Sequence, residues 1–358
     1  MSPPRWSYAG LDEDSGYGVA ARRLVRALRG AGHQVDWLPF RPGPGWGLGY
    51  EPAEALRPAP TLVAHLTPEY YPRFREVTGE ALLVAHTVWE TDRLPRHWPA
   101  LLEQADRVVV PSRWNAEVFG AEVEVPVAVV PHVAPEVVRT ASPTWAGLGP
   151  GTFVCYSIAP WTARKAVDRT VAAFAAAFTA RDDVALVLLT SPRDLTTGAT
   201  TVAAVARALG GRADPPRIVL VTHKVDEVEL AALHARGDCF VSLCRSEGWG
   251  LGAFDAGAYG NEVLITGHGG QLDYLDPDVA HLVDHELVPV DDPAGAPSYT
   301  PDQTWAEPSV GHAAALLRSL YESRDTSRGR RLALRIAERY GPQDVADAFV
   351  AACYGDRP

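Results

Sequence analysis

Two carboxylates stand eight positions apart, Glu247 and Asp255, at the two ends of a glycine-rich segment. An apolar run at 239–243 predicts a buried strand before this segment, and a helical pattern resumes from Phe254 to Tyr259. Peptide N–H groups at a helix start can face an anion, and flanking carboxylates can accept hydrogen bonds from sugar hydroxyls. The pattern therefore predicts a sugar-nucleotide site, whereas an isolated acidic pair would more often be a helix cap and a solvated side chain.

A cationic pair, Arg164 and Lys165, lies between a predicted strand at 153–158 and a predicted helix at 167–180. A sugar nucleotide leaves as a diphosphate, so a transferase must supply positive charge where negative charge accumulates on the leaving oxygen. Lys165 is the candidate for this catalytic role. Arg164 is either a second cation that binds the donor or a solvated residue near the start of a helix.

His86 ends a further apolar run, at the point where a predicted strand opens into a loop. A neutral imidazole can donate or accept a hydrogen bond with a sugar hydroxyl. A lone histidine is often structural, but the carboxyl end of a strand in an α/β sheet favours a binding or catalytic role.

Gly16 and Gly18 fall in a predicted loop between a strand near 5–8 and a helix at 19–31. Strand, glycine loop and helix in this order open a Rossmann-like unit, and the loop is then expected to contact the donor phosphates. An ordinary flexible loop is the alternative interpretation. A nicotinamide site is disfavoured, because Ala21 stands where the Gly-x-Gly-x-x-Gly fingerprint has its third glycine.

The remaining pattern consists of two series of apolar runs that alternate with helical stretches, which predicts an α/β fold with parallel sheets in two Rossmann-like lobes. Glycines and prolines between 137 and 152 indicate a linker between the series. The predicted strands lie at 35–40, 61–65, 81–87, 107–111 and 127–130 in the first series, and at 153–158, 184–190, 217–222, 239–243 and 263–266 in the second.

Composition narrows the class of protein. The 358 residues suit two cores, and 47% hydrophobic with 22% charged residues is typical of a soluble globular protein. No apolar run approaches the roughly 20 residues that cross a bilayer, and the amino terminus does not have the pattern of a signal peptide. Four scattered cysteines indicate reduced thiols, and hence a cytoplasmic protein, while the net charge of −11 disfavours nucleic acid and anionic lipid as partners.

Two patterns imitate metal sites, and neither has the context that a metal site needs. Asp12-x-Asp14 precedes the glycine loop, and His281-x-x-x-His285 has neither an intervening glutamate nor a third ligand. No metal is therefore predicted.

The segment from Glu247 to Asp255 resembles the Glu-x7-Glu motif of retaining glycosyltransferases of family 4, which have the GT-B fold, and the similarity continues through 267–273. Asp255 departs from the motif by being one methylene shorter. Lys165 and Asp168 match the Lys and Asp of that family's Gly-Arg-x4-Lys-Gly-x-Asp stretch, whereas the usual arginine is missing.

The resemblance implies an enzyme that moves a hexosyl unit from a nucleotide-diphosphate sugar to a hydroxyl group with retention and without a metal or cofactor. His86, Lys165 and Glu247 would be its catalytic residues. The donor would also contact a set of residues around the two glycine segments and the cationic pair. This set comprises Gly16, Gly18, Arg164, Gly248, Trp249, Gly250, Leu251 and Asp255.

The acceptor, a small molecule or glycan that the acidic charge balance favours as soluble, would be recognised by Trp89, Glu90 and Asp92. Their Trp-Glu-Thr-Asp-x-Leu-Pro segment recurs in a bacterial subgroup of the resembled family. The implied domains are an acceptor domain at 1–140, a linker at 141–152, a donor domain at 153–330, and a helix at 331–358 that crosses back to the first lobe. The two sheets would then face a central cleft.

Two other functions remain open at this point. A catalytically silent sugar-nucleotide or glycan-binding protein is consistent with Asp255 and the missing arginine. A nicotinamide-dependent oxidoreductase that uses the first lobe ranks last, because the third glycine of the fingerprint is absent.

Overall fold

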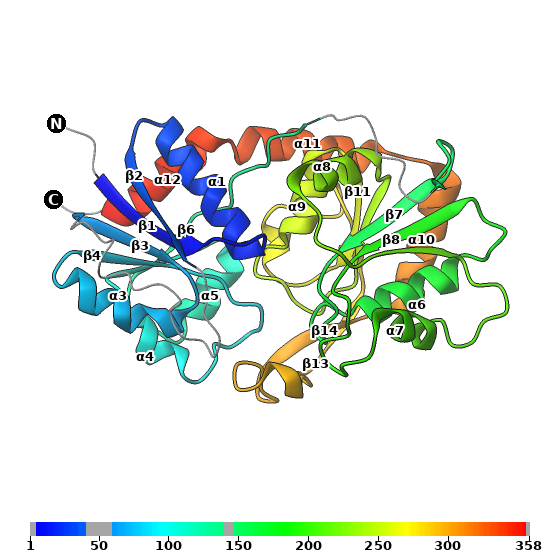
Figure 1. The fold of residues 1–358 in the computed structure, drawn as a ribbon, viewed down its shortest axis with the longest axis horizontal. Coiled ribbons are helices and arrows are strands. Elements are labelled where there is room, and N and C mark those ends of the chain that lie inside the picture. Colours follow the sequence, from blue (N-terminus) through cyan, green and yellow to red (C-terminus); the bar gives the residue numbers. More distant parts are fainter. Residues whose placement is uncertain (1–4, 41–58, 139–146, 356–358) are drawn as a thin grey trace. The chain divides into compact units, whose positions relative to one another are not determined.

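The computed structural model describes residues 5–40, 59–138 and 147–355. The chain divides into two compact units, which are Met1–Pro135 with Glu338–Pro358 (unit 1) and Glu136–Ala337 (unit 2). Each unit is an α/β layer structure with one main six-stranded sheet (Figure 1). The predicted α/β class with two Rossmann-like parts is therefore confirmed.

Unit 1 has the strand order β2-β1-β3-β4-β5-β6, and all neighbouring strands are parallel. Its strands are β1 (Arg5–Leu11), β2 (Gln34–Phe40), β3 (Thr61–His65), β4 (Leu82–His86), β5 (Arg107–Val110) and β6 (Val127–Val129). Its helices are α1 (Gly16–Gly30), α3 (Tyr71–Thr78), α4 (Trp98–Leu102), α5 (Arg113–Gly120) and α12 (Pro342–Tyr354), with a 3-10 turn η2 at Pro68–Tyr70.

The helices α1 and α12 lie side by side against the first sheet (Figure 1). Their apolar faces share one core with β1, in which Phe349 of α12 packs on Trp6 and Tyr8. The carboxyl-terminal helix of the chain is thus an integral layer of unit 1.

The predicted glycine loop is shorter than expected, because α1 begins at Gly16 rather than at Val19. Ser15 caps the helix by accepting a hydrogen bond from the backbone N–H of Gly18 at 3.3 Å. A side chain at Gly18 would overlap the carbonyl oxygens of Glu13 and Leu11, so this glycine permits the close turn into the helix.

Unit 2 has the strand order β12-β11-β10-β7-β8-β9, again with parallel neighbours throughout. Its strands are β7 (Phe153–Ile158), β8 (Val184–Leu189), β9 (Arg217–Val221), β10 (Cys239–Ser242), β11 (Glu262–Thr266) and β12 (His281–Val283). Its helices are α6 (Val167–Ala177), α7 (Thr201–Ala208), α8 (Glu227–Arg236), α9 (Leu251–Ala258) and α10 (Val310–Ser323), followed by α11 (Ser327–Arg339), which runs across the boundary between the units.

A separate antiparallel hairpin joins β13 (His285–Pro289) to β14 (Thr304–Pro308) in unit 2. The sequence pattern did not predict this hairpin. The residues from Val310 to Arg339 form two helices, because Arg324 adopts a left-handed conformation with φ of 51° and ends α10.

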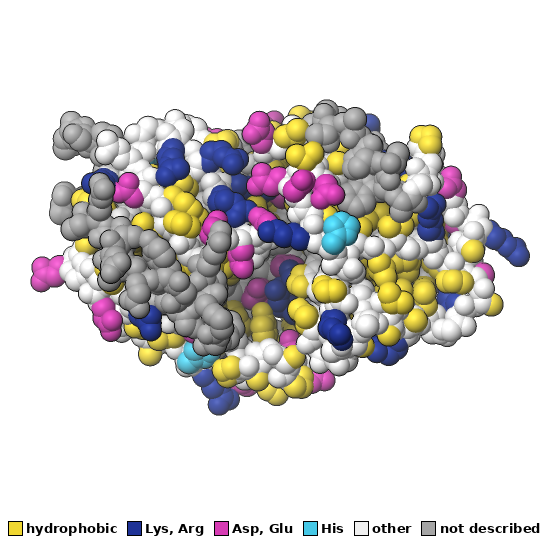
Figure 2. Space-filling model, viewed as in Figure 1, with side chains coloured by type: hydrophobic (Ala, Val, Ile, Leu, Met, Phe, Trp, Pro, Cys, Tyr) yellow, Lys and Arg dark blue, Asp and Glu magenta, His cyan; other side chains and the backbone are white. Residues whose placement is uncertain are grey.

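The cysteines, the surface charges and the helix lengths bear on the predictions drawn from composition. All four cysteines are buried and form no disulfide bond. Both acidic and basic side chains occur on the visible face of each unit (Figure 2), so on this face the acidic excess is not confined to one unit. Within the described ranges, no helix is both long and apolar enough to cross a membrane.

Candidate functional site

The second sheet has its topological switch point between β7 and β10. The chain proceeds from β7 to β8 and β9 on one side, and then returns to β10 and β11 on the other side. In open α/β sheets, ligands bind outside the carboxyl ends of the strands at such a point. The segments that follow β7 and β10 here carry Arg164, Lys165 and Glu247.

These three residues form one ion-pair cluster, although Glu247 is 83 positions from Arg164 and 82 from Lys165 in the chain. The ammonium of Lys165 donates to Oε1 of Glu247, and the Arg164 guanidinium donates to Oε2 at 3.2 Å and to the Ser246 carbonyl at 2.9 Å. The side chains of Glu247, Arg164 and Lys165 are only 12%, 15% and 19% exposed. The geometry therefore brings Arg164 beside Lys165 as a second cation rather than leaving it as a solvated residue.

The carboxyl group of Glu247 is charged in this cluster. Burial alone would raise its pKa, but the positive charges and hydrogen bonds of Lys165 and Arg164 outweigh burial and lower the pKa below its ordinary value. Two cations against one carboxylate leave one net positive charge, which suits an anionic ligand.

The loop that carries the two cations is held by Arg245 and the β13–β14 hairpin. The backbone N–H of Arg245 donates to the Arg164 carbonyl at 2.8 Å, and its guanidinium donates to the Ala163 carbonyl. Glu307 of β14 binds the Arg245 Nε at 2.6 Å and the Arg169 Nε at 2.6 Å. Arg245 also lies over the Trp305 ring, 5.1 Å from its centroid.

Neither Arg245 nor Glu307 was singled out from the sequence. Arg245 is two residues before Glu247, which was a usable signal, whereas Glu307 lies in a strand that the pattern did not indicate.

The glycines near Glu247 shape the backbone around it. Gly250 has φ of +81° and directly precedes α9, so the helix begins at Leu251 rather than at Phe254. Gly269 has φ of +97°, and a Cβ there would lie 2.7 Å from the Glu247 carbonyl oxygen. That oxygen accepts a hydrogen bond from the Gly270 N–H at 2.7 Å, which ties Glu247 to the next loop.

Two of the predicted donor contacts, Trp249 and Asp255, have buried side chains. The Trp249 ring is 3% exposed and packs on Phe254 and Tyr274, at centroid distances of 5.3 and 4.9 Å. Asp255 lies within α9 and is 7% exposed. The Trp249 ring therefore belongs to the core, and the donor contacts predicted for Gly248, Trp249, Leu251 and Asp255 stay predictions.

In unit 1, His86 is the last residue of β4 and is paired in register with His65, the last residue of β3. The two imidazoles stack with centroids 3.8 Å apart and planes at 13°, and His132 lies 6.4 Å from His86. The carboxyl ends of β1 and β3 flank the switch point of this sheet, which places His65 closer to that point than His86.

His65 was missed, although the sequence carried a signal for it. The runs that form β3 and β4 both end in Val-Ala-His, at Val63–His65 and at Val84–His86. Burial lowers the pKa of both imidazoles well below the ordinary value, so both rings are neutral.

The predicted acceptor loop places its aromatic ring inward. Trp89 is 4% exposed, its Nε1 donates to Thr91 Oγ1 at 2.7 Å and to the Arg93 carbonyl at 2.6 Å, and its ring packs on Trp98. The Trp89 ring therefore packs within unit 1, and its predicted contact with the acceptor stays a prediction. Glu90 is half-buried and Asp92 is exposed, so their predicted contacts stay predictions.

Gly16 is exposed at the start of α1, whereas Gly18 is buried in the first turn of this helix. The N–H of Gly18 donates to Ser15 Oγ, and the donor contacts predicted for Gly16 and Gly18 stay predictions.

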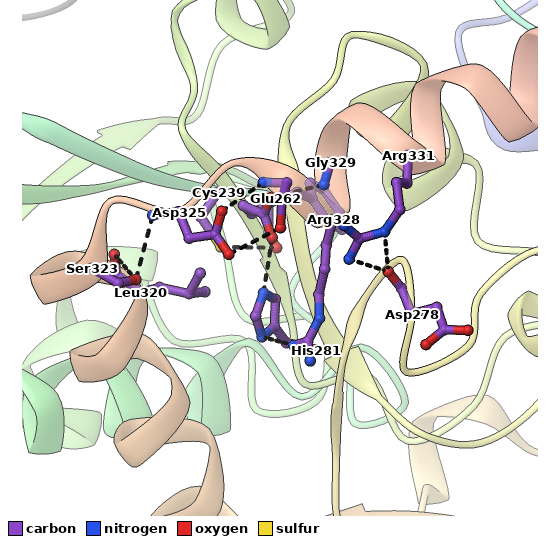
Figure 3. Close-up of polar contacts among 12 residues, drawn as sticks. Cys239, Glu262, Asp278, His281, Leu320, Ser323, Asp325, Arg328, Gly329 and Arg331 are labelled. Atoms are coloured by element: carbon purple, nitrogen blue, oxygen red, sulfur yellow. Dashed lines mark hydrogen bonds and ion pairs between the residues drawn. The ribbon is translucent and has the colours of Figure 1, made fainter.

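Among the described residues, no group of three or more His, Cys, Asp or Glu side chains could hold a metal ion. Asp14 pairs with Arg22 at 2.9 Å. His281 is bonded through Nε2 to the buried Glu262 at 2.8 Å and through Nδ1 to Arg328 at 2.7 Å, so both of its ring nitrogens are occupied (Figure 3).

No protein-family model matches the sequence, and no curated protein matches it. Solved structures, however, match almost the whole chain. HepE (Alr3699) from Anabaena, solved with UDP-glucose, is 12% identical with a TM-score of 0.71 over 97% of this chain and 98% of its own. Sucrose-phosphate synthase from Thermosynechococcus elongatus is 14% identical with a TM-score of 0.70 over 97% of each chain. A glycosyltransferase from Rickettsia africae ESF-5 is 10% identical with a TM-score of 0.69 over 99% and 98%.

At these identities the likeness establishes the fold alone. The architecture is GT-B, with one parallel six-stranded α/β sheet in each of its two parts.

Proposed function

We propose that this protein is a retaining glycosyltransferase, which moves a hexosyl unit from a nucleotide-diphosphate sugar to a hydroxyl group of a small-molecule or glycan acceptor. The observation that carries the proposal is the buried cluster of Lys165, Arg164 and Glu247 at the switch point of the second sheet. Residues 153–330 would bind the donor and residues 1–140 the acceptor.

The charge arrangement suits a departing diphosphate. As the bond between the anomeric carbon and the diphosphate oxygen breaks, negative charge grows on that oxygen, and Lys165 and Arg164 stabilise it in a site with little water. The acceptor oxygen forms the new bond on the same face of the sugar, and the leaving phosphate takes the acceptor proton. Lys165 and Glu247 then act at the leaving group and at the donor sugar, and His86 is the third catalytic residue of this proposal.

The fold supports the same class of donor. The neighbour from Anabaena was solved with UDP-glucose, and a neighbour from E. coli with a TM-score of 0.66 was solved with UDP-2-fluoro glucose. A catalytically silent binder of the same ligands is the second candidate. Asp255 favours it, because this carboxylate is shorter than the family's glutamate and is 7% exposed.

A thermal-shift screen against UDP, GDP, ADP, dTDP and NAD, with and without magnesium, tests the donor site. A ligand at a hundred times its dissociation constant stabilises the folded state by about 2.7 kcal/mol. We expect one diphosphate to raise Tm without magnesium, and Lys165→Ala to abolish the shift. Arg181→Ala is the matched control, because it removes an exposed cation from the loop before β8 in the same unit.

Turnover separates the two candidates. The nucleotide sugar of the diphosphate that binds is offered with acceptor hydroxyls, and proton NMR reports the anomeric configuration of the product. A product with inverted configuration would contradict retention, binding without turnover would favour the silent binder, and a shift with NAD alone would revive the oxidoreductase.

A further inference from the structure

The hydroxyl of Tyr8 lies between two histidine rings in unit 1. Tyr8 Oη is 2.8 Å from Nδ1 of His65 and 3.2 Å from Nδ1 of His86. The three residues come from β1, β3 and β4, and they are 0%, 2% and 2% exposed. Water therefore does not compete for these contacts.

The protons in this cluster can be counted. Both rings are neutral, so each carries one N–H and one lone pair, and the tyrosine carries one O–H proton because burial raises its pKa well above the ordinary value. Tyr8 can donate to only one of the two Nδ1 atoms. Both contacts are hydrogen bonds only if the other ring donates from its own Nδ1–H to the tyrosine oxygen.

The two distances favour one of the two arrangements. Hydrogen bonds from O–H donors are shorter, with a common distance near ~2.7–2.8 Å, than those from N–H donors, which are common near ~2.9–3.0 Å. The 2.8 Å contact therefore fits Tyr8 donating to His65, and the 3.2 Å contact fits His86 donating to Tyr8. His86 then has its proton on Nδ1 and a lone pair on Nε2.

The Nε2 atom of His86 is buried and has no hydrogen-bond partner among the described residues. A buried acceptor without a donor is costly, and a hydroxyl group that donates to it removes that cost. We propose that Tyr8 and His65 hold His86 in the Nδ1–H tautomer, so that its Nε2 accepts a hydrogen bond from a hydroxyl of the bound sugar. This inference rests on the proposed function and makes Tyr8 and His65 positioning residues.

Long-range proton–nitrogen NMR of ¹⁵N-histidine protein without ligand reports the tautomer directly. His86→Gln and His65→Gln spectra assign the signals among the 11 histidines. We expect a protonated Nδ1 and a bare Nε2 for His86, and the opposite pattern for His65. A protonated Nε2 on His86 would overturn the inference.

Two variants test the cause. His65→Phe keeps an aromatic ring beside His86 but removes the nitrogen that accepts the Tyr8 hydroxyl proton. Tyr8 should then donate to Nδ1 of His86, so His86 should change to the Nε2–H tautomer. Tyr8→Phe removes the hydroxyl, so His86 should populate both tautomers. Tyr71→Phe is the control, because it deletes another buried hydroxyl of unit 1, which donates to the Leu66 carbonyl at 2.9 Å. If the His86 tautomer stays unchanged in both His65→Phe and Tyr8→Phe, then Tyr8 and His65 do not set it.

A ligand arm separates this inference from the proposed function. UDP-glucose, GDP-mannose, ADP-glucose and dTDP-glucose are each compared with the matching diphosphate. The nucleotide sugar should shift the His86 Nε2 resonance more than the matching diphosphate does. His65→Phe should lower the affinity for the nucleotide sugar about tenfold and leave the affinity for the diphosphate unchanged. Binding of a nucleotide sugar without this resonance change overturns the inference alone, whereas no binding at all overturns the proposed function.

Discussion

The imidazoles of His65, His86 and His132 are buried near one another at the carboxyl ends of strands of the first sheet. Burial lowers the pKa of each, in the case of His132 to about 3 with a further contribution from Arg23. The unfolded chain takes up these protons near pH ~6.5, so it binds more protons than the folded chain below that pH. The free energy of unfolding is therefore undiminished above about pH 6.5 and falls as the pH drops below it.

Each of these histidines should contribute about 1.4 kcal/mol per pH unit to that fall once the unfolded chain is protonated. Urea unfolding between about pH 5 and pH 8, followed by deuterium pulse-labelling of β3 and β4 peptides at one fixed pH, measures the slope. His132→Phe should reduce the slope of the unfolding free energy with pH by the contribution of one histidine. His223→Gln, which changes an exposed histidine, should leave that slope unchanged. An equal slope in wild type and His132→Phe would be the contrary result.

Single residues also show where sequence inference succeeds and fails. Arg164 was a plausible second cation, and its contact with Glu247 could be suspected only because both follow strands of one sheet. Trp89 and Trp249 were predicted to contact the acceptor and the donor, and the structure adds that both rings pack in cores. Nothing in the local pattern states which way a ring turns, because tertiary packing decides that.

Among the elements, the β13–β14 hairpin has the most direct link to the site. Glu307 holds Arg245, and Arg245 bonds the carbonyls of Ala163 and Arg164. Glu307→Gln weakens the charge-assisted hydrogen bonds to Arg245 and Arg169 and loosens the cationic loop. We expect a loss of about 1.4 kcal/mol, or tenfold, in diphosphate affinity, measured by calorimetry.

Glu286→Gln is the matched control for this prediction. Glu286 lies directly across the hairpin from Glu307 and is exposed, so its change alters the same charge on the same element. Equal losses in both variants would mean that the hairpin acts through net charge and not through the loop.

The strands of the two main sheets were largely predictable, and the hairpin was not. Parallel strands covered on both faces are continuous apolar runs, such as Val184–Leu189, which matches its prediction to within a residue. The sequences of β13 and β14 mix charged residues and prolines with few apolar ones, and only their mutual pairing makes them strands. The start of α1 was placed late because the Ser15 cap and the close turn at Gly18 are local geometry that resembles a loop in sequence.

At the scale of the whole molecule, the cationic cluster belongs entirely to unit 2. Binding of the diphosphate should therefore slow deuterium exchange most in the segments at 159–166 and 244–251. The strands β3 and β4 of unit 1 should change less, because the diphosphate alone offers no sugar to His86. Exchange mass spectrometry with and without the diphosphate measures this, and greatest protection at the start of α1 would instead favour a phosphate site at Gly16.

The helix α12 gives the chain an order of assembly. Unit 1 takes its first 135 residues from one end of the chain and this helix from the other, with unit 2 between them. Val345, Phe349 and Cys353 of α12 complete the core around Trp6 and Tyr8. On a ribosome that makes the chain from its amino terminus, unit 2 is available to fold before α12 has emerged. Part of the apolar core of unit 1 therefore stays open until α12 has been synthesised.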